Sequence, residues 1–140
     1  MYDAILFPTD GSEGSERARE HALALAADQH ATLHVLNVVE ATAPGASLHE
    51  LVADNLRELG EGIVSEVAEM GTDRGIDVET TVVEGDPART IVAYAESNDI
   101  DVIVMPTHGR PELTKAIVGS VTDKVIRTGD VPVTVVKLAE

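Results

Sequence analysis

Short apolar runs alternate with longer helical segments along the whole chain, and no other feature constrains its fold as much. The runs that predict strands are residues 4–7, 32–39, 77–84, 101–106 and 131–137. They are nearly all apolar, which is typical of parallel strands covered on both faces. Strand and helix in alternation predict right-handed βαβ units. We therefore predict an α/β fold: a single Rossmann-like domain over residues 1–140, with a five-stranded parallel sheet and helices on both faces.

Helical spacing and capping residues identify the segments between these strands. Ser12 is a candidate N-cap followed by Glu13 and Glu16 in the first turn, and the core-facing residues of this helix would be Ala18, Ala22, Leu25 and Ala26. The longest helix is predicted over residues 47–74, and its apolar side would comprise Leu48, Val52, Leu56, Leu59, Ile63, Val67 and Met70. Gly60 and Gly62 should weaken it locally. Asp86 and Pro87 suit the start of a short third helix, and residues 120–128 form the last.

A net charge of −15, from 25 acidic and 10 basic residues, limits the partners. Such an excess argues against nucleic acid and anionic membranes, and three aromatic residues are too few for base stacking. It is typical of a solvated acidic surface, such as one adapted to high salt in a halophile. The absence of cysteine excludes disulfides and thiolate sites. No apolar run approaches the ~20 residues of a membrane span, and the N-terminus is unlike a signal peptide, so we expect a cytoplasmic protein.

In open parallel sheets, ligands bind beyond the carboxyl ends of the strands, where the strand order reverses. With five strands we expect that reversal between the first and the fourth. The residues that follow these two strands are Pro8, Thr9 and Asp10 on one side and Met105 to Gly109 on the other. We therefore expect the functional site there.

The segment MPTHGRPELTKAIVGSVTDKVI, residues 105–126, has the features of a phosphate-binding loop. Nine residues separate Gly109 from Gly119, and Ser120 then opens a helix whose first N–H groups favour an anion. Alternatively, Ser120 only caps that helix and both glycines only turn the chain. Charge favours the anion site, because four of the ten basic residues (Arg110, Lys115, Lys124 and Arg127) fall near the loop with only Glu112 and Asp123 to oppose them. Neither GxxxxGK[ST] nor GxGxxG is present.

Three further stretches, together with this loop, resemble the universal stress protein family over essentially the whole length. They are PTDGSEGSERA (8–18), LHVLNV (33–38) and GDPARTIVAYA (85–95). Nucleotide-binding members of the family carry Gly-x-x-Gly-x(9)-Gly-Ser/Thr. Gly109, Gly119 and Ser120 match that motif, whereas Pro106 occupies the place of its first glycine.

The resemblance implies the universal stress protein fold and an ATP site between the first and fourth strands, with a magnesium ion. Asp10 would take the ribose hydroxyls, although capping the turn into the first helix is its alternative role. Val35 would line the adenine slot, and Pro8, Thr9, Met105 and Pro106 would form its walls. The phosphates would be held by Gly109, Gly119, Ser120, Val121 and Thr122.

Several functions remain open at this stage. The first is a stress-response regulator that binds ATP and signals through a protein partner; the second is a dimeric scaffold that binds no nucleotide, which Pro106 favours. The third is slow ATP hydrolysis, since no catalytic triad or carboxylate pair lies near the loop. A phosphoacceptor receiver is excluded because no fifth helix follows the last strand. His108 could donate to a ligand, but the histidines share no metal-ligand spacing.

The last apolar run also predicts an oligomeric state. Residues 132–136 come last in the chain, and no helix follows to cover them. An exposed apolar edge strand tends to pair with another strand. We therefore expect a homodimer through this C-terminal strand, and the family resemblance implies the same pairing.

Overall fold

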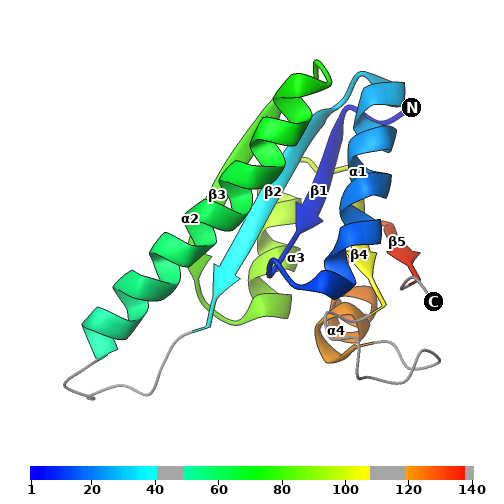
Figure 1. The fold of residues 1–140 in the computed structure, drawn as a ribbon. Coiled ribbons are helices and arrows are strands. Elements are labelled where there is room, and N and C mark those ends of the chain that lie inside the picture. Colours follow the sequence, from blue (N-terminus) through cyan, green and yellow to red (C-terminus); the bar gives the residue numbers. More distant parts are fainter. Residues whose placement is uncertain (41–48, 108–118, 138–140) are drawn as a thin grey trace.

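A five-stranded parallel sheet forms the centre of the molecule in the computed structural model, which describes residues 1–40, 49–107 and 119–137 (Figure 1). The strands are β1 (Ala4–Pro8), β2 (Thr32–Val39), β3 (Val78–Glu84), β4 (Val102–Pro106) and β5 (Val133–Val136). They lie in the order β3-β2-β1-β4-β5, so the direction of winding reverses between β1 and β4. The predicted fold class and the predicted place of the reversal are confirmed.

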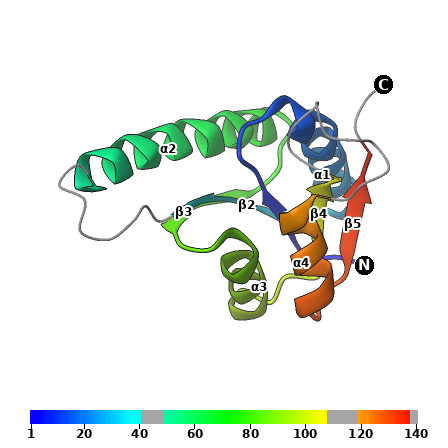
Figure 2. The same ribbon diagram turned by 90° about the horizontal axis from the view of Figure 1, so that it is seen from below.

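Helices cover both faces of the sheet (Figure 2). They are a short 3₁₀ helix, η1 (Glu13–Ser15), and α1 (Glu16–Gln29), α2 (His49–Asp73), α3 (Pro87–Ser97) and α4 (Ser120–Thr128). One buried cluster joins α1 and α2 to strand residues such as Phe7 and Val35. A second joins α3 and α4 to Leu6, Leu36 and Met105 on the opposite face. No helix in the described part of the chain is long and apolar enough to cross a membrane.

The start of α1 differs from the prediction. Ser12 precedes η1 and its side chain makes no capping bond, so α1 itself begins at Glu16. Leu23 is fully buried in α1, whereas the predicted core residue Leu25 is only partly buried. Asp86, by contrast, caps α3 as predicted, because its carboxylate accepts from the Arg89 amide at 3.0 Å.

The predicted apolar side of α2 is only partly buried. Leu56 and Leu59 are exposed, at 36% and 64%, whereas Val64 and Val67 lie in the core. The N-terminal end of α2 reaches past the carboxyl ends of β2 and β3, so the sheet does not cover that end (Figure 1). Leu48 and the side chain of Val52 lie outside the described residues.

Gly60 is not simply a weak point in α2. The helix is continuous through it, and Gly60 is buried where a Cβ would lie only 2.5 Å from Oδ1 of Asn37 and 3.0 Å from Val82. A glycine therefore lets the helix approach β2 and β3 closely at this point. Gly62, in contrast, has nothing within 4 Å of its would-be Cβ.

Candidate functional site

The pairing of β1 with its two neighbours locates the candidate site. β1 pairs with β2 through to Pro8, which lies opposite Leu36. With β4, however, its register runs only from Ile5 to Leu6, the latter opposite Ile103. β1 and β4 thus continue beyond their last pairing, at the reversal point where sheets of this kind bind ligands.

Buried polar side chains gather at this edge of the sheet. The described residues include six such side chains, and five of them lie near this edge. Thr9 and Thr107 directly follow β1 and β4, Asn37 lies near the end of β2, Ser15 ends η1, and Thr122 is in the first turn of α4. Buried polar groups need partners, so their concentration here identifies a specifically built region. The sixth, His34, lies within β2 and bonds the Tyr94 hydroxyl at 2.8 Å. Burial lowers the pKa of His34, and nearby Glu79 partly offsets this.

The backbone after β1 is held by bonds to β2. The Thr9 amide donates to the carbonyl of Leu36 at 2.9 Å. The Asn37 side chain donates from Nδ2 to the Thr9 carbonyl, also at 2.9 Å. Both polar groups of the Thr9 backbone are therefore fixed by adjacent residues of β2.

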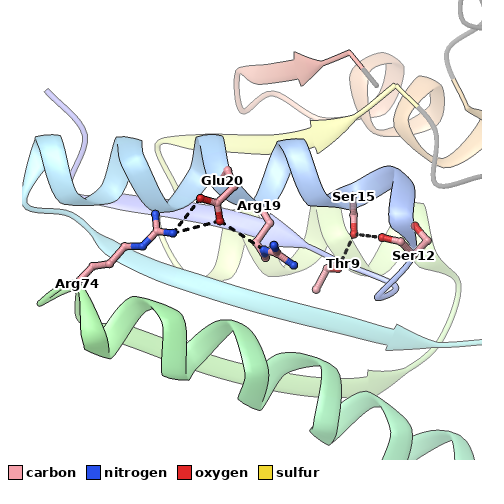
Figure 3. Close-up of polar contacts among 6 residues, drawn as sticks. All are labelled: Thr9, Ser12, Ser15, Arg19, Glu20 and Arg74. Atoms are coloured by element: carbon pink, nitrogen blue, oxygen red, sulfur yellow. Dashed lines mark hydrogen bonds and ion pairs between the residues drawn. The ribbon is translucent and has the colours of Figure 1, made fainter. Parts of the chain in front are cut away.

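Hydroxyl groups hold the turn that follows (Figure 3). Oγ1 of Thr9 accepts from the Gly11 amide at 3.1 Å and lies 3.3 Å from Oγ of Ser15. Oγ of Ser15 donates to the Ser12 carbonyl at 2.8 Å. Gly11 has φ of +76°, a conformation that favours glycine, and packs against Ile63 of α2. These contacts within the protein set the conformation of the loop.

Asp10 lies exposed at the tip of this turn. Its Oδ1 accepts from the Ser12 amide at 2.9 Å, so Asp10 does cap the turn into the first helix. A carboxylate has a second oxygen that can accept further bonds, so this capping leaves Asp10 able to bind sugar hydroxyls. Oγ of Ser12 is buried and has no hydrogen-bond partner among the described residues.

On the other side, α4 is tied to the end of β4. Oγ1 of Thr122 donates to the Pro106 carbonyl at 3.0 Å, and the Gly119 amide donates to the Thr107 carbonyl. Gly119 is the N-cap and offers no side chain to the first turn. As in any α-helix, the first amides, at residues 120–122, have no intrahelical acceptor. This end of α4 can therefore accept an anion.

Most of the predicted site residues come together at this edge. β1 ends at Pro8 and is followed by Thr9 and Asp10, and β4 ends at Pro106. The N-cap and first turn of α4 are Gly119, Ser120, Val121 and Thr122. Met105 is 4% exposed and packs in the α3–α4 core, and Val35 is 0% exposed within the opposite cluster. In this conformation neither side chain has surface to offer a ligand. Gly109 and His108 lie outside the described residues.

The predicted basic character of the region is only partly visible. Arg110 and Lys115 lie outside the described residues. Nε of Arg127 binds both carboxylate oxygens of Asp123, at 3.0 and 2.9 Å, within one turn of α4. Lys124 is exposed on the same helix. No cluster of three or more histidine and carboxylate side chains in the described part of the chain could hold a metal ion.

Two surface hollows lie elsewhere, between α2 and the edge strand β3. One, of about 360 Å³, is lined by Glu61, Val64, Ser65, Thr80, Thr81 and Val82. Neither is lined by a residue of the candidate site at the carboxyl ends of β1 and β4. They are open grooves beside an edge strand, whereas the ordered polar groups lie at the reversal point, which we take as the candidate site.

Comparisons with known proteins agree with the fold. Residues 1–137 match the universal stress protein family. Universal stress protein MJ0531 of Methanocaldococcus jannaschii is 36% identical over 141 residues, covering 98% of this chain and 83% of that protein. The solved structure of MJ0577 from the same organism superposes with a TM-score of 0.88 at 30% identity, covering 100% of this chain and 99% of that one.

A third comparison concerns a universal stress protein whose structure was solved in complex with cAMP. It has a TM-score of 0.78 and covers 99% of each chain. At 24% identity this likeness shows the shared fold alone.

Proposed function

Because the chain belongs to the universal stress protein family, we propose that it is a stress-response regulatory protein that binds ATP with Mg²⁺ between β1 and β4. It signals the bound state through dimer or partner contacts. The cAMP complex of a protein with the same fold agrees with an adenine nucleotide as ligand. The observation that carries the proposal is the set of bonded polar groups at the reversal point, with an acceptor at Asp10 and the first amides of α4, which have no acceptor within the helix.

The residues present fit the two ends of a nucleotide. Asp10 keeps one carboxylate oxygen for ribose hydroxyls after capping its own turn. The amides of Ser120, Val121 and Thr122 suit phosphate oxygens, and the positive end of the α4 dipole adds to them. The hydroxyl proton of Thr122 is already donated to Pro106, so Thr122 would serve through its amide.

Magnesium would be bound mainly by the phosphates themselves. Mg²⁺ keeps several waters and commonly takes substrate phosphates with only one or two protein carboxylates. The described residues provide no larger cluster of ligands. The ion would supply charge neutralisation between adjacent phosphates, so ATP should bind more weakly without it.

The test begins with the purified protein, from which bound nucleotide is released by denaturation and identified by mass spectrometry. Calorimetry should then give micromolar affinity for MgATP, on the order of −8 kcal/mol. Gly119→Val should abolish binding, because a branched side chain would stand where phosphate meets the backbone. Gly119 has φ of −62°, which any residue adopts, so the substitution tests space and not backbone strain.

Gly62→Ala is the matched control, since its Cβ would meet nothing within 4 Å. Equal ATP affinity in wild type and Gly119→Val would remove the phosphate assignment. A wild type that neither carries nor binds any nucleotide would instead support the scaffold function.

A further inference from the structure

Asn37 lies where β1, β2 and α2 meet, with one end of its side-chain amide bonded to the chain after β1 and the other close to α2. It is only 7% exposed. Its Nδ2 donates to the Thr9 carbonyl at 2.9 Å. Its Oδ1 faces Gly60 of α2, where even a Cβ would lie 2.5 Å away. Because a carbonyl oxygen can only accept, the amide must keep this orientation to satisfy Thr9.

The carbonyl that Asn37 holds belongs to the peptide unit joining Thr9 to Asp10. A peptide unit is planar, so fixing its oxygen also fixes the direction in which the chain enters Asp10. The Ser12 amide then fixes one carboxylate oxygen of Asp10. Backbone and side chain of Asp10 are thereby set before any ligand arrives.

We propose that Asn37 is a positioning residue that directs the Asp10 carboxylate toward the ribose hydroxyls of a nucleotide. Gly60 leaves the space that the Asn37 side chain occupies. This inference rests on the proposed function and assigns Asn37 and Gly60 a part in it. Asn37 touches no ligand in this scheme and acts through Thr9. Without it, the Thr9 carbonyl loses a buried partner, and the Thr9–Asp10 peptide turns to find another.

The same contacts connect α2 with the nucleotide site. Gly60 follows directly after Leu59, which is 64% exposed on the surface of α2. A shift of α2 against β2 would press on Oδ1 of Asn37 and so on Asp10. Ribose recognition is thus sensitive to the position of α2.

The test compares ATP with its 2′-deoxy and 3′-deoxy analogues by calorimetry. One of the two analogues lacks the hydroxyl that donates to Asp10. Wild type should bind ATP about tenfold or more tightly than that analogue, as expected for a hydrogen bond to a charged group. Asn37→Leu keeps the branched shape and the number of side-chain heavy atoms, and removes the donor. In this variant the ratio should fall to about one, because ATP binding weakens while analogue binding changes less than about threefold. A general loss of protein stability would instead weaken the binding of ATP and of the analogue equally, and the ratio would not change.

Two glycine variants in one helix separate positioning from folding. Gly60→Ala displaces the Asn37 amide and should lower the ratio as Asn37→Leu does, whereas Gly62→Ala should leave it unchanged. If Asn37→Leu does not fold, Gly60→Ala carries the test. A wild-type ratio kept in the folded Asn37 and Gly60 variants overturns the proposal, as does equal binding of all three nucleotides by wild type. If wild type binds no nucleotide, the proposed function itself fails.

Discussion

Pro106 occupies the place of a motif glycine, and its neighbours show where the missing N–H would have pointed. The amides of Ile103 and Thr107 donate to the carbonyls of Pro132, just before β5, and of Val136, at the end of β5, at 2.9 and 3.0 Å. Successive amides of a strand point to opposite sides, so an amide at residue 106 would face β1. The β1–β4 pairing has already ended there, at Ile103. Proline therefore breaks no bond of the sheet, and what it removes is one donor facing the candidate site.

We predict that Pro106→Gly changes ATP affinity by less than about tenfold, because a neutral hydrogen bond is worth about 1 kcal/mol. The Pro106 carbonyl that anchors Thr122 is kept in the variant. Calorimetry on the two proteins, with Gly119→Val as the non-binding reference, measures the difference. Tight binding by Pro106→Gly together with none by wild type would make the proline a lock and favour the scaffold function.

Motifs predicted those site residues whose chemistry is visible in the sequence, such as Asp10 and Gly119. They missed Asn37 and Ser15, because the first lies inside an apolar run and the second inside a helical one. A polar residue near the end of a buried strand was the available signal for Asn37. Val35 was assigned through the resemblance alone. Side chains alternate between the two faces along β2, and that of Val35 lies on the face covered by α1 and α2.

At the scale of the elements, the parallel sheet and the helices on its two faces followed from the alternation of apolar runs, whereas the extent of burial did not. Helical spacing shows which residues share a side but not how far the covering layer extends. Leu56 and Leu59 share the predicted apolar side of α2 with Val67, yet they are 36% and 64% exposed whereas Val67 is buried. Local patterns likewise gave no sign of the contact between Arg74 and Glu20. The Arg74 guanidinium donates to the Glu20 carboxylate at 2.9 Å and so joins the turn after α2 to α1 (Figure 3).

The starts of β1 and β4 are joined by Asp101, which gives a prediction about stability. Its Oδ2 accepts from the amides of Asp3 at 2.7 Å and Ala4 at 3.0 Å, and these bonds lower the pKa of the carboxyl. Asp101→Asn should cost at most about 1 kcal/mol at neutral pH, since water partly shields the group. That corresponds to a fall of about 4 °C in thermal melts.

The pH dependence of this difference follows from the lowered pKa. The native state favours the charged carboxylate, so the contribution of Asp101 is fully present above the unfolded pKa of about 4 and is lost as pH falls through the lower native value. Melting curves of wild type and variant should therefore converge in acid. Asp130→Asn, at an exposed position, controls for the loss of one negative charge. A gap that widens toward acid pH would contradict the assignment.

For the whole molecule, the two edges of the sheet differ in how they are protected. β3 carries the exposed acids Glu79 and Glu84, and charges on an edge strand discourage pairing with another chain. β5 reads Val133-Thr134-Val135-Val136, without a charge, and all four residues are only half-buried. Self-association is therefore expected at β5, against the repulsion of two chains that each carry −15.

We predict that the protein is a homodimer through β5 and that Val135→Glu shifts it toward monomer in light scattering. The substitution places a charge on the apolar edge, and in the dimer it would do so twice, once from each copy. Thr80→Glu, on the opposite edge strand, adds the same charge and should leave the dimer intact. Because screening weakens repulsion between the acidic copies, the dimer should tighten between roughly 0.1 M and 1 M salt. A wild type that stays monomeric at tens of micromolar in high salt would refute the assignment of β5 as an interface.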